Sequence, residues 1–288
     1  MKGFIELRKV LDKDNNILGA NDSLKVELII QPEQKQEFET QVCCPLVKQM
    51  LQLFDNEQMI DICFDVDGSV VFGHRFVLKV MAPEILSTLT ELTMIPDTTP
   101  SITIHNTSEK VFRCVLRYLY GGGLPEQDFI LSHGMEIIST ADQYEVTQMK
   151  LEIEALLVTS RVINVANVVE YLLFADGKNC ALLKENSMSF LVARLDDVMA
   201  GDSYQQLQSS DKLISELLKF TKMSGRGTDT NDLKTLSVVA LRQKLQHKYL
   251  NIDGSKEMLI SRLEEFSNDD DVDSGIDADD EEIYIELV

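Results

Sequence analysis

The stretch from Asp61 to Leu78, DICFDVDGSVVFGHRFVL, constrains the fold more than any other part of the chain. Apolar and polar side chains alternate on both sides of the dipeptide Asp67-Gly68, which is typical of two strands joined by a two-residue turn. Both central residues of that turn need positive φ, which Gly adopts freely and Asp tolerates. The polar pair His74 and Arg75 follows, just before an apolar helix. The stretch therefore predicts a β-hairpin that leads directly into a helix.

The segments around this hairpin show mostly the helical period. Before it, one buried helical stripe is predicted from the spacing of Val47, Met50, Leu51 and Phe54. The elements predicted after it are a helix over 80–92 with a bend at Ala82-Pro83, a third strand over 101–106, a helix over 109–120 that Ser108 caps, and two helices within 125–158. This order predicts an α+β domain in which a small sheet is flanked by helices.

The order of elements and a series of landmark residues resemble a BTB/POZ domain across residues 41–158. The landmarks, in chain order, are Asp61, Phe72, His74, Leu78, Ile104, Val111, Phe112, Leu116, Tyr118, Tyr120, Gly121, Ala141, Asp142 and Tyr144. The resemblance implies a domain that forms homodimers and recruits partners. It also implies a charged pair near the dimer interface, Asp61 and Arg75, for which a local ion pair at the strand end is the alternative.

The same resemblance implies a contact with a cullin-3 type scaffold. Such adaptors use an apolar-x-Glu motif in the loop after the third BTB helix, together with a neighbouring helix end that carries Tyr. In this chain Leu89, Thr90 and Glu91 provide the motif, at a shorter offset from the preceding Pro than in speckle-type POZ proteins, and Tyr118 and Tyr120 mark the helix end. A helix-surface Glu beside a core Leu is the alternative interpretation.

Residues 1–31 contain two strand-like pieces, 3–10 and 23–30, separated by a turn-rich segment. They resemble the last two strands of a MATH (TRAF-like) sandwich, whose groove captures a Ser/Thr-rich degron in speckle-type POZ proteins. Phe4 matches an aromatic residue of that groove, but Lys2 stands where the family has Trp. We therefore interpret residues 1–31 as a MATH-like remnant; a strand pair lying on the neighbouring domain, or a truncated gene model, is the alternative.

Helical periodicity continues through residues 159–223. One face is predicted from Val165, Val168, Val169, Leu172 and Leu173, and another from Leu213, Leu217, Leu218 and Phe220. The run NVVEYLLFAD resembles the first repeat of the BACK region that follows BTB domains in cullin-3 adaptors. A plain helical extension is the alternative, and residues 224–230 have the composition of a flexible linker.

Residues 231–266 predict two short helices joined by a glycine turn. Buried stripes are predicted from Val238, Leu241, Leu245 and Tyr249 and from Leu259, Ile260, Leu263 and Phe266. The pattern V-x-x-L-R-x-x-L followed by G-x-K-x-x-L-I-x-R-L resembles a SAP motif. That resemblance implies DNA or RNA binding by Arg242, Lys244, Lys248, Gly254, Lys256 and Arg262. A helical hairpin used for protein contact is the alternative.

The net charge of −21 is unevenly distributed. Ten acidic residues lie between Asp269 and Glu286, within a segment, 267–288, that we expect to be a disordered tail. These carboxylates could compete with phosphate for the basic face of the SAP-like unit, or they could simply be solvated. The net charge alone therefore does not exclude a nucleic-acid partner.

The remaining composition bears on chemistry and location. The five cysteines lack CxxC spacing and the four histidines are scattered, so neither a metal site nor a cofactor is predicted. Catalytic motifs are absent, as are a signal peptide and an apolar run of the roughly 18 to 20 residues that cross a bilayer. We expect a non-enzymatic protein of the nucleus or cytoplasm, without membrane contact, that adapts an unknown protein substrate to a cullin-3 ligase. The alternatives are a nuclear BTB scaffold or transcription-associated DNA-binding protein, and a general interaction module without a ubiquitin link.

Overall fold

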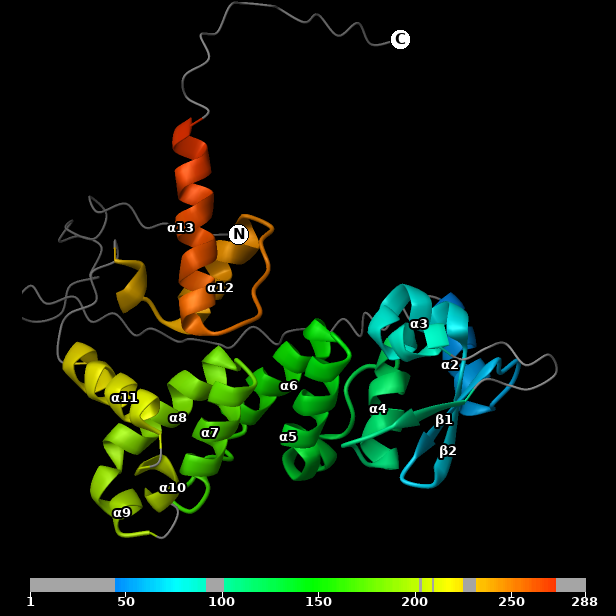
Figure 1. Cartoon of the computed structure of the whole chain (residues 1–288), viewed down its shortest axis with the longest axis horizontal. Coiled ribbons are helices and arrows are strands. Elements are labelled where there is room, and N and C mark those ends of the chain that lie inside the picture. The colour runs from blue at the N-terminus through cyan, green and yellow to red at the C-terminus, as the bar shows by residue number, and fades with distance from the viewer. Residues whose placement is uncertain (1–44, 92–100, 202–203, 209, 225–231, 273–288) are drawn as a thin grey trace, which may run out of the picture. The chain divides into compact units, whose positions relative to one another are not determined.

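The computed structural model of the chain describes residues 45–91, 101–201, 204–208, 210–224 and 232–272 (Figure 1). The chain divides into two compact units between Cys43 and Cys44, and every described residue belongs to the second unit. The predicted MATH-like strands with Phe4, nearly all of the linker and most of the acidic tail lie outside the described residues.

A three-stranded sheet with the order β2-β1-β3 forms around the predicted hairpin. Strands β1 (Ile62–Val66) and β2 (Ser69–Gly73) pair antiparallel, and β3 (Ser101–Ile104) pairs parallel to β1. Asp67 and Gly68 adopt φ values of 50° and 79°, as a two-residue turn of this type requires. The predicted hairpin and third strand are confirmed.

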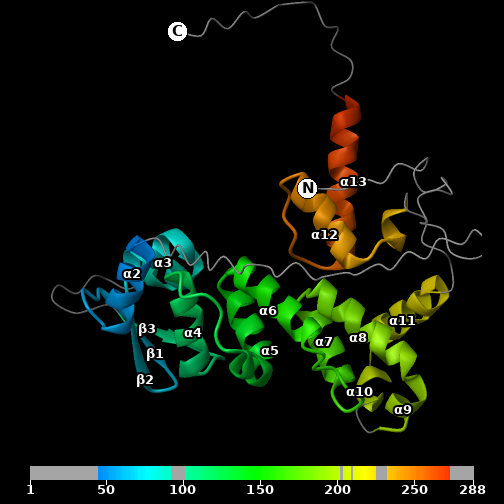
Figure 2. The same ribbon diagram turned by 180° about the vertical axis from the view of Figure 1, so that it is seen from behind.

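The sheet belongs to a domain that also contains six helical segments. They are α2 (Pro45–Asp55), α3 (Arg75–Met81), the 3-10 helix η2 (Pro83–Glu91), α4 (Glu109–Leu119), α5 (Gln127–Gln143) and α6 (Thr147–Thr159). Phe64 of β1 and Phe112 of α4 are both fully buried, and their rings meet edge to face with centroids 5.1 Å apart. Helices α5 and α6 pack side by side in both views (Figures 1 and 2). The predicted α+β domain is confirmed.

The helical extension continues the same hydrophobic core. It consists of α7 (Val168–Gly177), α8 (Ala181–Ala193), α9 (Leu195–Met199), α10 (Tyr204–Gln208) and α11 (Asp211–Ser224). Val168, Val169 and Leu172 are fully buried, as their spacing predicts. Leu218 is 59% exposed, so its predicted burial is wrong. Adjacent helical positions point about 100° apart, and the neighbouring Leu217 already faces the core.

A second, smaller core lies in the C-terminal unit, which contains η3 (Leu233–Thr235), α12 (Val238–His247) and α13 (Lys256–Val272). Its buried residues from these helices are Val238, Leu241, Leu245, Leu259, Ile260 and Leu263. Tyr249 is 98% exposed, against the predicted stripe, because α12 has ended and Tyr249 has a φ of 56°. Helix α13 also continues to residue 272, beyond the predicted start of the tail at 267.

The end of α4 provides a test of backbone packing. Gly121 has a φ of 83°, and a Cβ there would lie 2.6 Å from Val47 Cγ1, whereas Gly123 has a φ of 69° with open space around it. We expect Gly123→Ala to lower the free energy of unfolding by about 1 kcal/mol through backbone strain. Gly121→Ala should cost about 1 to 3 kcal/mol more through overpacking. Urea unfolding measures both, and equal losses would contradict the proposed clash with α2.

Candidate functional site

The hairpin is joined to α3 by the polar residues that the sequence singled out. Asp61 Oδ1 accepts a hydrogen bond of 2.7 Å from the backbone N–H of Arg75, which places a carboxylate at the start of the helix. The His74 ring lies 2.7 Å from the Tyr120 hydroxyl through Nδ1 and 2.7 Å from the Gln58 carbonyl oxygen through Nε2. Within the single chain Asp61 thus contacts the backbone of Arg75, and the role of this charged pair near a dimer interface stays a prediction.

Helix α3 leaves an apolar surface uncovered, which we call the α3 face and define by Phe76, Val80 and Met81. These side chains are 74%, 64% and 53% exposed. Phe76 and Val80 are one helical turn apart and therefore lie on the same side of the helix. Exposed apolar groups that gather on one helix mark a contact surface more often than isolated ones do.

Two of the predicted scaffold-binding positions lie in different environments. Tyr120 is only 3% exposed, its ring stacks on Phe54 with centroids 4.6 Å apart, and burial raises the pKa of its hydroxyl. Within the single chain the Tyr120 ring therefore belongs to the core, and a contact between Tyr120 and a scaffold stays a prediction. Tyr118 is partly exposed, and burial together with the nearby Glu152 carboxylate raises the pKa of its hydroxyl to about 12. Leu89, Thr90 and Glu91 end η2, and only their backbone is described.

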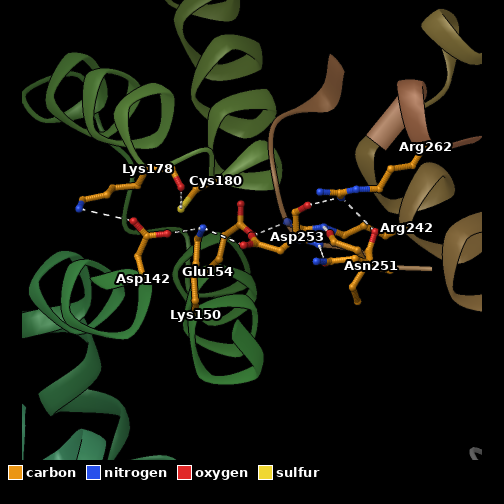
Figure 3. Close-up of polar contacts among 10 residues, drawn as sticks. Asp142, Lys150, Glu154, Lys178, Cys180, Arg242, Asn251, Asp253 and Arg262 are labelled. Atoms are coloured by element: carbon orange, nitrogen blue, oxygen red, sulfur yellow. Dashed lines mark hydrogen bonds and ion pairs between the residues drawn. The ribbon is translucent and has the colours of Figure 1, made fainter. Parts of the chain in front are cut away.

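Three of the predicted phosphate-binding cations have partners within the chain, and Figure 3 shows two of them, Arg242 and Arg262. Arg242 Nη2 lies 2.7 Å from Glu154 Oε2, and that carboxylate is fully buried. Lys256 Nζ lies 3.2 Å from Glu185 Oε1. Arg262 donates to the backbone carbonyls of residues 251 and 253.

The other predicted nucleic-acid residues differ from these. Lys244 is exposed, whereas Lys248 places its ammonium group 3.8 Å from the centroid of the Phe266 ring. Gly254 has a φ of 120° and forms a parallel β-bridge with Cys180. The predicted nucleic-acid residues therefore lie together in the C-terminal unit, but most of them already contact other residues of the chain.

A buried lysine extends the same contact region. Lys150 is 3% exposed, and its Nζ lies 2.8 Å from Asp142 Oδ1 and 3.1 Å from Asp253 Oδ2 (Figure 3). Burial alone would lower the pKa of Lys150, but hydrogen bonds and charge from Asp142 and Asp253 outweigh it and raise that pKa. Lys150 therefore remains a cation that joins α5 and α6 to the turn before α13.

We call these contacts between the helices and the C-terminal unit the docking interface. Its ion pairs are Arg242 with Glu154, Lys150 with Asp253, and Lys256 with Glu185. Sequence reasoning missed the three members on the helices, Lys150, Glu154 and Glu185. A signal was present in the sequence, because Lys150 and Glu154 are charged residues four apart among the apolar residues of α6, and both are buried.

The described part of the chain shows neither a metal centre nor a membrane span. No group of three or more His, Cys, Asp or Glu side chains there could hold a metal ion. None of its helices is both long and apolar enough to cross a bilayer.

Comparison with known proteins agrees with this architecture. The BTB/POZ domain family model matches residues 50–161, and the SAP domain family model matches residues 232–268. The chain thus contains a region that matches BTB/POZ domains and, after the helical extension, a smaller region that matches SAP domains.

Two of the similar proteins are named for a POZ domain together with a second domain. BTB/POZ and MATH domain-containing protein 4 of Arabidopsis thaliana is 29% identical over 63% of this chain and 42% of its own length. Protein maternal effect lethal 26 of Caenorhabditis elegans is 22% identical over 73% and 52%, and TD and POZ domain-containing protein 1 of Mus musculus is 26% identical over 57% and 44%. The chain therefore spans about half of the length of these relatives.

The buried lysine gives a test of the docking interface. Replacing Lys150 by Met leaves Asp142 and Asp253 without their shared cation, and we expect a loss of about 3 kcal/mol in unfolding free energy. The control is Lys178→Met, since Lys178 is 34% exposed and lies 3.6 Å from the same Asp142. That change should cost less than about 1 kcal/mol. Similar losses for the two variants in urea titrations would contradict the larger stabilising contribution that we assign to the buried Lys150.

Proposed function

We propose that this chain is a non-enzymatic adaptor that dimerises through its BTB domain and presents a protein substrate to a cullin-3 type ubiquitin ligase. The SAP domain would direct the adaptor to nucleic acid, with the nucleus or cytoplasm as its location. The ligase would carry out the chemistry. The observation that carries the self-association part is the α3 face, on which three large apolar side chains are more than half exposed.

A second copy of the chain is the occupant that we assign to the α3 face. The face lies on the helix that directly follows the hairpin, within the residues that match the BTB/POZ model. Burial of apolar surface stabilises association by about 25 cal/mol per Å² before the costs of association are subtracted. Two α3 faces brought together would remove Phe76 and Val80 of both copies from water.

The dimer can be tested by charge introduction. We expect Phe76→Asp together with Val80→Asp to convert a wild-type dimer to a monomer in light scattering coupled to size exclusion, because two carboxylates would have to be desolvated. Leu218→Asp is the control, since Leu218 is similarly exposed but lies on α11. A wild-type monomer, or a double variant that remains dimeric, would contradict the assignment.

The scaffold contact is supported by the resemblance to cullin-3 adaptors and by the position of its motif. Leu89, Thr90 and Glu91 come at the end of η2, which follows α3 in the BTB domain. Tyr118 is partly exposed on α4 and remains available as a second contact. We therefore propose that the end of η2 and Tyr118 together form the surface that meets the scaffold.

A co-purification experiment tests this contact. We expect the double variant Leu89→Asp, Glu91→Ala to lose cullin-3 at micromolar protein, because a charge would replace the apolar anchor of the motif. The dimer mass of the variant serves as its folding control. Absence of a cullin signal with the wild-type protein would remove the adaptor function and favour the second candidate.

That second candidate is a nuclear scaffold or DNA-binding protein whose BTB domain serves self-association alone. The observation that favours it is the SAP domain at residues 232–268. In a dimer two such domains would bind one nucleic-acid molecule with higher avidity than a single domain. Both candidates share the nucleic-acid role of the SAP domain and differ in the scaffold contact.

A further inference from the structure

The basic side of the SAP domain faces carboxylates of the preceding helices. Arg242 pairs with the fully buried Glu154, and Lys256 pairs with Glu185. Glu185 also accepts, through Oε2, a hydrogen bond of 3.0 Å from the backbone N–H of Val238, the first residue of α12. The Glu185 carboxylate thus contacts both the Lys256 ammonium group and the N-terminus of α12.

These are the groups that bind phosphate in other proteins. Backbone N–H groups at a helix N-terminus and cationic side chains favour phosphate oxygens through hydrogen bonds and charge. Carboxylate oxygens satisfy the same donors with the same sign of charge. In this chain, Glu154 and Glu185 therefore occupy donors that the SAP resemblance assigns to phosphate.

The contact is also of a kind that can separate. The SAP domain has its own core, and the helical extension contributes to it one buried residue, Ala181, and a partly buried neighbour, Leu182. Separation would thus expose little apolar surface while breaking the ion pairs of Glu154 and Glu185. Water can solvate the freed carboxylates on the helices, and phosphate can replace those carboxylates on the SAP domain, whereas neither replaces apolar contacts.

We propose that duplex DNA and the helical extension compete for the same face of the SAP domain, so that DNA binds only after Glu154 and Glu185 release it. The docking interface is then an autoinhibitory contact in which carboxylates take the place of phosphates. This inference rests on the nucleic-acid part of the proposed function. It also assigns the role of phosphate mimic to α6 and α8, two helices distant in sequence from the acidic tail.

Competition predicts a defined gain of affinity. When the binding-competent form is a fraction of the population, the apparent dissociation constant is raised by the inverse of that fraction. A chain that is undocked about one tenth of the time binds DNA about tenfold more weakly than its SAP domain can. The double variant Glu154→Gln, Glu185→Gln weakens docking and leaves Arg242, Lys256 and Arg262 intact, so we expect the full chain to bind duplex DNA about tenfold more tightly.

The experiment uses fluorescence anisotropy with a 20-base-pair duplex at fixed salt. Removing two carboxylates strengthens DNA binding a little at any site, so the control is Glu84→Gln with Glu170→Gln, two exposed glutamates of η2 and α7. The control should shift affinity by less than about twofold through net charge alone. Because Glu154 is fully buried, Glu185→Gln alone serves as a milder variant, and thermal unfolding confirms that each protein is folded.

Hydrogen exchange supplies a readout that does not depend on the variants. Addition of duplex to the wild-type chain should increase exchange in α6 and at the start of α8, where the SAP domain leaves. Equal DNA affinity of wild type, double variant and control, with unchanged exchange in α6, would overturn the competition and leave the nucleic-acid role standing. Failure of all the proteins to bind duplex would overturn both.

Discussion

The carboxylate of Glu154 holds together three parts of the chain that are far apart in sequence. It lies on α6 with none of its side chain exposed, and it accepts a hydrogen bond of 3.0 Å from the backbone N–H of Leu183 at the start of α8. Its second oxygen pairs with Arg242 of the SAP domain. A buried charge is tolerated only when it is paired and hydrogen-bonded. The position of the SAP domain is therefore coupled to the packing of α6 against α8.

A comparable polar arrangement organises the BTB domain. His74 follows β2 and contacts two distant parts of the domain. Its ring reaches Gln58 in the loop before β1 and Tyr120 at the end of α4. Asp61 caps α3 by accepting a hydrogen bond from the backbone N–H of Arg75. These contacts fix the helix that carries the α3 face, because they hold its N-terminus on the sheet. In the single chain, the landmark residues Asp61, His74 and Tyr120 thus position the α3 face.

Most of the BTB architecture can be predicted from the sequence because its signals are local. The turn at Asp67 and Gly68 requires positive φ, and the start of α4 after Ser108 follows from the helical period. The mechanism at Ser108 is different from the expected one, however. Its side chain makes no capping hydrogen bond, and its backbone N–H donates to Glu136 Oε1 at 2.5 Å. A helix boundary can therefore be predicted correctly while its cause depends on a residue far along the chain.

The candidate sites are less accessible to sequence reasoning, because they depend on what faces each residue. The cations of the SAP motif are where the pattern predicts, yet the pattern contains nothing about Glu154, 88 residues before its partner Arg242. Tyr120 satisfies the landmark order and is nevertheless buried against Phe54. Periodicity predicts which face of a helix is apolar, but not which distant side chain covers the polar one.

The bridge between Cys180 and Gly254 has a consequence for the chemistry of the chain. Cys180 is completely buried where α8 begins, and burial raises the pKa of its thiol to about 12. Only the thiolate is a good nucleophile, so the sulfur is protected from oxidants and electrophiles in this arrangement. The protection of the Cys180 thiol therefore depends on folding, because an exposed cysteine would have an ordinary pKa. The main core of the chain therefore shields this thiol, directly beside the backbone bridge that connects α8 to the SAP domain.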